Sequence, residues 1–267
     1  MAGRFVQVAW LLWSVIGISG LLGSTLATAT EDSEAQALRA RAQVYWDAQV
    51  KGDWAAVFPF LYPADRINMS VEQFVTRQQS WMFRYLAAEV IDAAVANNLG
   101  WVQVNYTIEF KRLQENLPAL EPKRLQVWEP WEKRDAWYVL STKEQRERVP
   151  SLPPRLRPAA EEAVLARRVE EFWQARQALD WAQAYQYLEP AYREQVSKET
   201  FLQRKPYYTY LSHGLAWVEV IGDEGRARVR YTAKINDPSL AKLDPQEKEI
   251  NENWIKVDGQ WYLQTPR

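Results

Sequence analysis

The residues that most often carry out catalysis or bind metals are scarce in this sequence. The chain has 267 residues, a single histidine (His213) and no cysteine. Thiol nucleophiles, thiolate zinc sites, iron–sulfur clusters and disulfides are therefore excluded. A serine–histidine–acid site would have to use His213, as would most hydrolytic zinc sites. A lone histidine is more often structural or exposed, so His213 is a weak catalytic candidate. The sequence predicts no metal site and no cofactor.

Catalytic sequence motifs are also missing. The sequence has no Gly-x-Ser-x-Gly, His-Glu-x-x-His, Walker or dinucleotide-binding glycine motif, which excludes the enzyme classes that those motifs define. An enzyme that works through isolated Asp, Tyr or Arg side chains, or through His213, remains an alternative.

One long stretch of the sequence occurs twice. "KGDWAAVFPFLYPADR" (51–66) returns as "ALDWAQAYQYLEPAYR" (178–193). With Trp46 aligned to Trp173, no gap is needed as far as Arg77 and Arg204, and the match resumes in the later strands. Repeats of this length are whole domains rather than solenoid units. The sequence therefore predicts two tandem copies of one domain.

The charged residues that both copies share are predicted to be structural. Asp53 and Asp180 stand where a helix begins, so an N-cap role explains them. A second shared set consists of arginines and glutamates, which would form a charge-assisted network between helices and sheet. The alternative is that one arginine faces a cavity and binds a carboxylate or phosphate. The set comprises Arg66/Arg193, Arg77/Arg204 and Glu72/Glu199.

Aromatic residues are the best candidates for ligand binding. The chain has 14 Trp and 13 Tyr, and rings that point into a cavity could bind an apolar or ring-shaped ligand. Simple core filling is the competing explanation. The candidates are Trp101, Tyr106, Trp137, Trp217, Tyr231 and Trp261.

A basic strand distinguishes the second copy. Its polar face carries Arg226, Arg228, Arg230 and Lys234, where the first copy has mainly uncharged residues. Such a face could bind an acidic partner or anionic head groups, or it could simply be solvated and protected against edge pairing. The net charge of the whole chain is −1, which gives no argument for a nucleic-acid partner.

Periodicity predicts the elements of each module. Leu38, Ala42 and Tyr45 recur at helical spacing, Gly52 can end that helix, and Ser70 with Gln73 forms a capping box. A second helix is expected to run from Asp53 to the proline at 63. "WVQVNYTIEF" (101–110) alternates like a half-buried strand, and "NWIKVDGQWYL" (253–263) predicts a hairpin. The expected fold is α+β, with three helices on one face of a curved antiparallel sheet in each module.

These residues resemble those of a known superfamily. An opening helix, then "GDW…LYP…R…S.E.F", then strands that end in "W…DAWYVL" or "W.KVDGQWYL", is similar to the nuclear transport factor 2-like superfamily. The resemblance covers nearly all of the chain after its first segment, twice. It implies cone-shaped domains whose sheet wraps around a cavity, and an internal pseudo-dimer of the two modules. It does not imply one function, because the superfamily includes isomerases, dehydratases, adaptors and non-catalytic domains.

The first 29 residues differ from the rest of the chain. After Arg4 no charge occurs before Glu31, and Ala27-Thr28-Ala29 has the form of a signal-peptidase site. The apolar run is long enough to span a bilayer, so residues 5–29 could also be an uncleaved anchor. The predicted division is 1–29 signal peptide or anchor, 30–142 first domain, 143–158 Pro/Arg-rich linker and 159–267 second domain.

Three functions are compatible with these patterns. The leading hypothesis is an exported, non-catalytic protein, secreted or periplasmic, that binds a small amphipathic ligand or a partner protein of the cell envelope. The first alternative is an isomerase- or dehydratase-like enzyme with an acid or base in its cavity. The second is a membrane-anchored structural or assembly subunit.

Overall fold

A computed structural model describes residues 21–111, 120–204, 206–240 and 242–265. The predicted signal peptide or anchor (1–29) lies mostly outside these residues. The first described helix begins at Leu21 and runs without a break into the first domain, so it starts before the expected domain boundary at 30. Within the described ranges, none of the helices has both the length and the apolar character that crossing a membrane requires.

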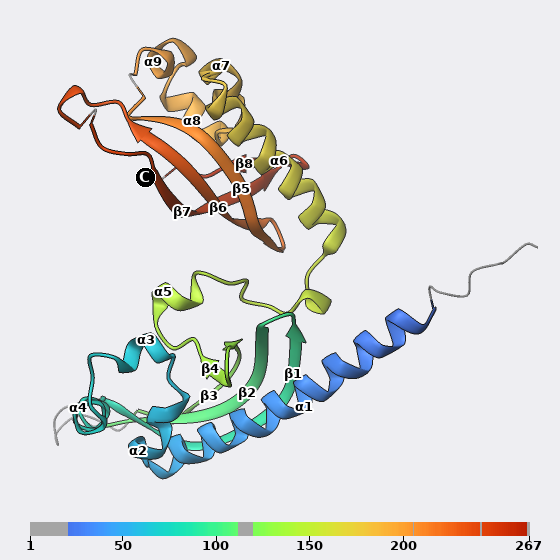
Figure 1. Cartoon of the computed structure of the whole chain (residues 1–267), viewed down its shortest axis with the longest axis vertical. Coiled ribbons are helices and arrows are strands. Elements are labelled where there is room, and N and C mark those ends of the chain that lie inside the picture. The colour runs from blue at the N-terminus through green and yellow to red at the C-terminus, as the bar shows by residue number, and fades with distance from the viewer. Residues whose placement is uncertain (1–20, 112–119, 205, 241, 266–267) are drawn as a thin grey trace, which may run out of the picture.

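The first half of the chain (21–140) is mixed α+β. Its four strands form one antiparallel sheet in the order β1-β2-β3-β4, and α1 packs along β1 (Figure 1). The helices are α1 (Leu21–Lys51), α2 (Trp54–Val57), the 3-10 turn η1 (Phe58–Phe60), α3 (Pro63–Arg66) and α4 (Val71–Gln79). The strands are β1 (Phe83–Ala96), β2 (Leu99–Phe110), β3 (Lys123–Lys133) and β4 (Trp137–Val139).

The second half (159–265) has the same order of main elements. Its sheet is again antiparallel, in the order β5-β6-β7-β8, and α6 packs along β5. The helices are α6 (Ala159–Gln177), α7 (Trp181–Ala184), η3 (Tyr185–Tyr187), α8 (Pro190–Gln195), α9 (Lys198–Leu202) and η4 (Pro238–Leu240). The strands are β5 (Tyr208–Ile221), β6 (Glu224–Ile235), β7 (Gln246–Val257) and β8 (Gln260–Leu263). The expected α+β class with antiparallel sheets is confirmed.

The connecting segment (141–158) is largely structured. It contains the short helix α5 (Lys143–Arg146) and the 3-10 turn η2 (Pro154–Leu156). Thr142 and Gln145 form a capping box at the start of α5, each side chain bonding the other's backbone N–H. The segment that joins the two sheets therefore has secondary structure of its own (Figure 1).

Helix boundaries follow from local chemistry, with one difference from expectation. Gly52 has φ +69° and ends α1, and Ser70 forms the predicted capping box with Gln73. In the second half Leu179 adopts the same left-handed conformation, with φ +59°. The expected second helix is split, because Leu61 N bonds to Phe58 O three residues back and closes a 3-10 turn. Each module therefore has more and shorter helices than predicted.

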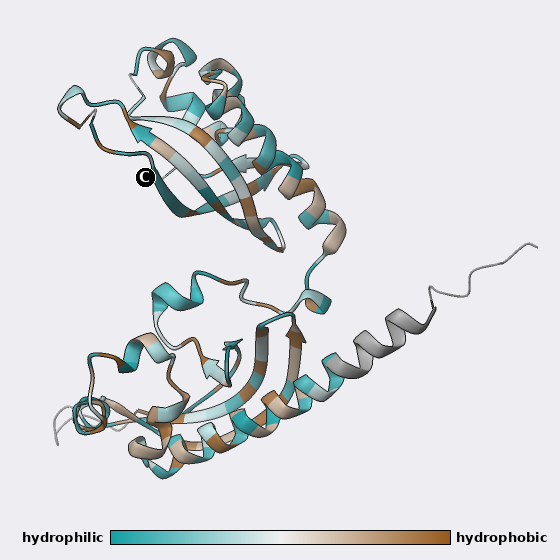
Figure 2. Cartoon of the chain, viewed as in Figure 1, coloured by the Kyte–Doolittle hydropathy of each residue, from teal (hydrophilic) through white to brown (hydrophobic). Residues whose placement is uncertain are grey.

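The sheets curl at matching places. In β1 the register with β2 shifts between Tyr85 and Ala87, and in β5 the register with β6 shifts between Tyr210 and Ser212. Such bulges increase local twist and bend a strand. Apolar and polar residues alternate along the strands (Figure 2). The predicted hairpin between β7 and β8 is confirmed, with Asp258 and Gly259 both at positive φ.

Each half has its own core under its long helix. Leu38 on α1 and Leu165 on α6 are fully buried, each on the face of its helix that packs against the sheet. A Cβ placed on Gly100 would lie 2.4 Å from Leu38 Cδ2, and one on Gly225 would lie 2.7 Å from Leu165 Cδ2. Glycine at these two strand positions therefore lets the helix approach the sheet closely.

Candidate functional site

A pocket of about 490 Å³ opens among the helices of the first half. We call it the helical pocket. Aromatic rings from α1, α2, α4 and the turn after α4 form much of its wall, and Ser141 to Lys143 at the start of the connecting segment close one side. Its wall includes Tyr45, Gln49, Trp54, Phe74, Gln78 and Trp81. The Trp54 and Trp81 rings lie 5.9 Å apart, centroid to centroid. A pocket of this size and lining suits a small apolar or ring-shaped molecule.

Two amide side chains give the helical pocket buried polar groups. Gln49 and Gln78 are only 5% and 7% exposed. Gln78 Oε1 is buried and accepts no hydrogen bond from any described residue. Leaving such an acceptor unpaired costs free energy, so a bound molecule that donates a hydrogen bond here would remove that cost.

Charged side chains stand around the same pocket. Arg77 from α4 and Lys143 from α5 line it together with Asp65. Asp65 Oδ2 accepts a hydrogen bond from Gln145 Nε2 at 2.7 Å. Among the described residues Arg77 makes no ion pair, whereas Lys143 Nζ lies 3.7 Å from Glu147 in a largely exposed contact. The lining therefore carries two cations and one anion.

The corresponding place in the second half is arranged differently. Tyr192 stands where the first half has Asp65, and its hydroxyl accepts a hydrogen bond from Arg204 Nη1 at 2.9 Å. Arg204 is the counterpart of Arg77 in the ungapped alignment. The arginine that lines the pocket in the first half is thus bonded to a tyrosine in the second.

A buried carboxylate that the sequence analysis missed lies beneath α1. Glu129 Oε2 accepts hydrogen bonds from the indole N–H groups of Trp46 (3.2 Å) and Trp131 (3.1 Å). Burial raises the pKa of Glu129 to about 7, and the two indoles and the charge of Arg146 act in the opposite direction. Burial therefore favours the protonated, neutral form of this carboxyl more than in an exposed glutamate.

The second half carries the same carboxylate with a different neighbour. Glu252 Oε1 accepts from Trp173 Nε1 at 3.1 Å, and Arg176 Nη1 lies 3.7 Å away. Burial raises the pKa of Glu252, and the Arg176 charge and the indole of Trp173 lower it. Gln49 occupies the position of Arg176 in the first half. The signal that could have revealed this pair is Glu-x-Trp, present in both copies as 129–131 and 252–254.

Glu252 and Arg176 also line a second cavity. It measures about 480 Å³, and Glu189, Asn253 and Thr265 contribute to its wall. Thr265 Oγ1 donates to Glu189 Oε1 at 3.3 Å. Most of the residues that line this cavity have polar side chains, and none is aromatic, whereas four aromatic residues line the helical pocket.

None of the six aromatic ligand candidates lines the helical pocket. Tyr106 stacks on Trp46 and Tyr231 packs on Trp173, both with centroids 5.1 Å apart. Trp137 and Trp261 are 4% and 1% exposed within the two cores. Tyr231 and His213 both line a third cavity, which measures about 480 Å³.

The other two candidates contact the connecting segment. Trp101 Nε1 donates to Pro150 O at 2.9 Å, and Trp217 Nε1 donates to Arg148 O at 2.8 Å. One comes from the first sheet and the other from the second, so the segment is bonded to both.

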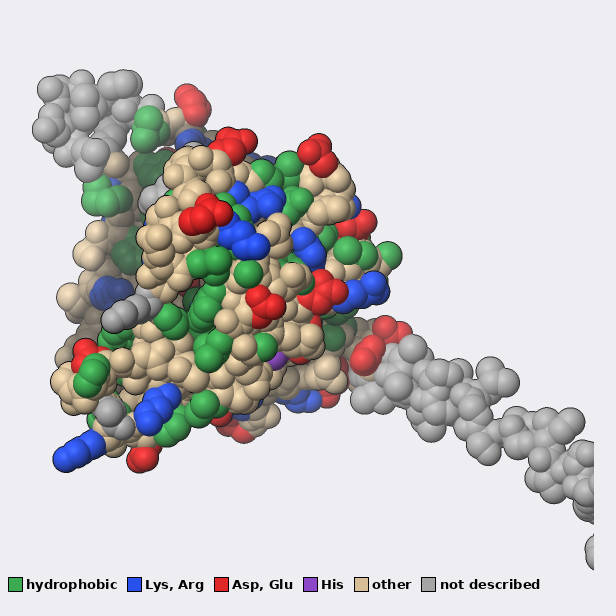
Figure 3. All heavy atoms as spheres, turned by 90° about the horizontal axis from the view of Figure 1, so that it is seen from above, with side chains coloured by type: hydrophobic (Ala, Val, Ile, Leu, Met, Phe, Trp, Pro, Cys, Tyr) green, Lys and Arg blue, Asp and Glu red, His purple; other side chains and the backbone are tan. Residues whose placement is uncertain are grey.

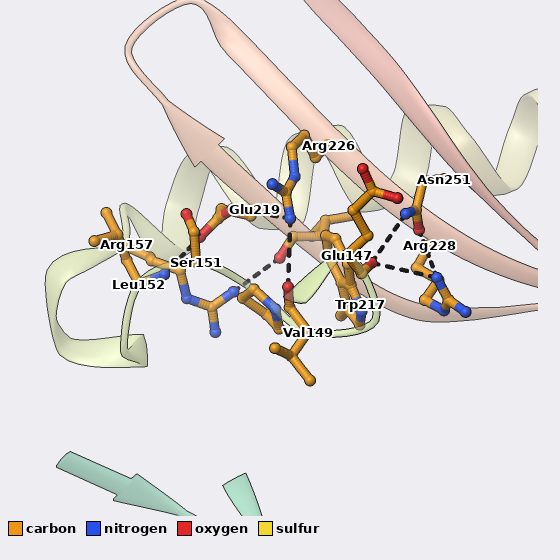
Figure 4. Close-up of polar contacts among 12 residues, drawn as sticks. Glu147, Val149, Ser151, Leu152, Arg157, Trp217, Glu219, Arg226, Arg228 and Asn251 are labelled. Carbon is orange, nitrogen blue, oxygen red and sulfur yellow. Dashed lines mark hydrogen bonds and ion pairs between the residues drawn. The ribbon is translucent and has the colours of Figure 1, made fainter. Parts of the chain in front are cut away.

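Arginines of the basic strand hold the same segment (Figure 4). Arg226 Nη2 donates to Val149 O at 3.3 Å, and Arg228 Nη1 donates to Glu147 O at 3.2 Å. Arg228 and Arg230 also pair with acidic side chains of β7, with Glu249 at 2.6 Å and 3.0 Å. Lys234, the fourth member, is exposed and makes no ion pair with a described residue. Most of the positive charge on this strand is therefore matched within the chain.

A buried acid completes this contact. Glu219 is 1% exposed, and its Oε1 accepts from Ser151 Oγ and Leu152 N, both at 2.9 Å. Arg157 Nη1 donates to Val218 O at 2.8 Å beside it (Figure 4). Asn251 Nδ2 of β7 donates to Glu147 O at 2.9 Å. Side chains from β5, β6 and β7 therefore bond to the connecting segment.

His213 is enclosed by hydrogen-bond partners. Its Nδ1 lies 2.8 Å from Gln177 Oε1 and its Nε2 lies 2.9 Å from Glu170 Oε1. Both ring nitrogens therefore face acceptors on α6. In the described part of the chain, no group of three or more His, Asp or Glu side chains is placed to hold a metal ion.

The shared acids and arginines occupy separate places. Asp53 Oδ1 accepts from Ala56 N at 3.1 Å and Asp180 Oδ1 from Gln183 N at 2.9 Å, as N-cap residues do. Arg66 lies over the ring of Tyr138 (5.3 Å) and Arg193 over that of Tyr262 (5.4 Å). Within the described residues, neither arginine pairs with an acid, and Glu72 and Glu199 stand at the N-termini of α4 and α9.

Acidic and basic side chains are interspersed on the end of the molecule seen from above. Figure 3 shows no large area of one sign there. This agrees with the near-zero net charge of the chain.

Comparisons with known proteins leave the family open. No protein-family model matches the chain, and no curated protein matches it. Among solved structures, a SEC-C motif-containing protein from Rhodopseudomonas palustris is 13% identical with a TM-score of 0.29, covering 35% of this chain and 69% of its own. An Ntf2-like protein involved in plasmid conjugation is 13% identical with a TM-score of 0.26, covering 85% of this chain and 96% of its own. With TM-scores below 0.5, neither match establishes fold or function.

Proposed function

We propose that this chain is an exported, non-catalytic protein of two tandem nuclear transport factor 2-like modules, and that the first module binds a small amphipathic ligand in the helical pocket. The observation that carries the proposal is the pocket itself, with aromatic rings in its wall and with Gln78 Oε1, which accepts no hydrogen bond from a described residue, in its lining. The rings offer apolar surface and the amide offers one oriented polar contact, which together define an amphipathic ligand.

The proposed export rests on the sequence of residues 1–29, with its basic start, apolar run and small–x–small site. Modules that arose by duplication explain why both halves share the same strand order and the same Glu–Trp pair. The two modules and the connecting segment between them would form the internal pseudo-dimer.

Binding of N-phenyl-1-naphthylamine, a neutral aromatic probe that carries one N–H donor, tests the proposal. Fluorescence titration of the full chain should show saturable binding. Met69→Trp places a larger ring in the pocket lining and should weaken binding by about tenfold or more. Val196→Trp, at the counterpart position of the second half, is the matched control and should leave binding unchanged. Equal effects of the two variants, or no binding at all, would refute the proposal.

A second candidate function is proton transfer at Glu129. The observation that favours it is a buried carboxyl bonded to the indoles of Trp46 and Trp131. Burial raises its pKa to about 7, and a general acid or base works best when its pKa lies near the working pH. Glu129 does not line the helical pocket, so the binding function is the better supported of the two. An isomerase assay that compares wild-type protein with Glu129→Gln tests this function. Turnover by the wild type that is lost in the variant would support it, and equal turnover would refute it.

A further inference from the structure

We infer that the ligand of the helical pocket is an anion, and that Arg77 and Lys143 hold its charged group; this inference rests on the proposed function. Arg77 comes from α4 and Lys143 from α5, and both side chains line the same pocket. Two cations from different elements that border an aromatic-walled cavity define a site for a flat apolar body with a carboxylate, sulfonate or similar head.

The charge balance of the pocket supports an anion over a cation. Asp65 is the acid of the lining, and its Oδ2 is already bonded to Gln145 Nε2 at 2.7 Å. Arg77 has no ion-pair partner among the described residues, and the contact of Lys143 with Glu147 is long (3.7 Å) and exposed. An incoming anion can therefore bind both cations without breaking a close ion pair.

Comparison with the second half strengthens the assignment to Arg77. Its counterpart Arg204 donates to the hydroxyl of Tyr192 at 2.9 Å. Tyr192 replaces Asp65 in the aligned sequence. Arg204 in the second half would have to give up that contact before it could bind an anion. Arg77 in the first half has no such contact with a described residue to give up.

The apolar part of the ligand would lie against the tryptophans. Trp54 and Trp81 flank the pocket with their rings tilted by 57° and 5.9 Å apart, and Phe74 is buried beside them. Arg77 and Phe74 lie three residues apart on α4, which places their side chains on neighbouring parts of one helix face. A ligand that spans both would have its ring system near Phe74 and its charge near Arg77.

Two probes with the same ring system separate this inference from the proposed function. 8-Anilinonaphthalene-1-sulfonate carries a sulfonate, and N-phenyl-1-naphthylamine is its neutral analogue. In the full chain, Arg77→Gln should weaken binding of the sulfonate about tenfold, the size of one charge-assisted contact, and change binding of the neutral probe by less than about twofold. Lys143→Gln should act in the same direction. Raising the salt concentration should weaken only the sulfonate.

Arg204→Gln is the matched control and should leave the affinity of both probes unchanged. The inference is overturned if Arg77→Gln affects the two probes equally, affects neither, or acts no more strongly than Arg204→Gln. In those cases the neutral probe still binds and remains sensitive to Met69→Trp, so the proposed function stands. If Met69→Trp does not weaken binding of the neutral probe, both the proposed function and this inference are refuted.

Discussion

The two halves of this chain keep the same buried glutamate and surround it differently. In the first half Glu129 is held by two indoles, with the neutral Gln49 on the helix above. In the second half Glu252 is held by one indole, and Arg176 supplies a positive charge 3.7 Å away. The shared part, a tryptophan on the long helix bonded to a glutamate on the third strand, belongs to the scaffold. The residue beside the glutamate, Gln49 in one half and Arg176 in the other, differs, so a difference in function between the halves would arise at such positions.

The largest difference between the halves should follow removal of Arg176. Arg176→Ala would leave the carboxylate of Glu252 buried without its cation, which we expect to lower the free energy of unfolding by about 3–5 kcal/mol. Gln49→Ala, the matched change in the first half, removes no charge and should cost about 1 kcal/mol. Urea unfolding of both variants measures the contrast. Similar costs would show that Arg176 does not stabilise Glu252.

Glu129 should make stability depend on pH. Its pKa is raised from 4.5 to about 7 by burial, so between these values the folded state binds more protons than the unfolded state. Stability from this group is therefore greatest below about pH 4.5 and falls by about 3 kcal/mol as the pH rises from there to just above 7. Glu129→Gln should remove this part of the dependence. The test is the difference between wild-type and variant unfolding curves from pH 5 to 8, and a difference that is flat with pH would contradict it.

Loss of Glu219 should loosen the connecting segment. Glu219→Ala leaves Ser151 Oγ and Leu152 N without their acceptor, at a cost of about 2 kcal/mol. Ala94 is the counterpart in the first half, so this acid is a feature of the second sheet alone. Hydrogen exchange should rise in residues 148–157 and stay unchanged in β1. Exchange that rises equally in both places would mean that Glu219 stabilises the whole chain.

Helix capping should give the smallest contrast. Ser70 and Gln73 form a reciprocal box, whereas Ser197 is followed by Thr200 and its cap uses one backbone bond. Ser70→Ala should cost about 1 kcal/mol and Ser197→Ala somewhat less. Thermal unfolding of the two variants can rank them, and the reverse order would argue against a role for Gln73.

Local rules predicted the local structure well. Three features depend only on residues close together in sequence: the capping box at Ser70, the helix end at Gly52 and the hairpin at Asp258. Local sequence is therefore enough to predict them. The period-two pattern of residues 101–110 likewise identified a half-buried strand, which is β2. The split of the second helix was missed because a 3-10 turn and an α-helical turn have similar sequence preferences.

The site depended on contacts that no local pattern contains. Trp46 meets Glu129 across 83 residues, and Arg228 meets Glu147 across 81. The basic face of β6 was predicted to be exposed. Two of its arginines, Arg226 and Arg228, instead donate hydrogen bonds to backbone carbonyls of the connecting segment. The helical pocket was missed for the same reason, since its lining comes from four helices and the start of that segment.

A crystal structure of the full chain with N-phenyl-1-naphthylamine tests the central claim most directly. The account predicts density for the probe in the helical pocket of the first half, against Trp54 and Trp81, with its N–H toward Gln78. Density only in the cavity beside Glu252, or a helical pocket closed by its own side chains, would contradict the claim that the first half is the ligand-binding module.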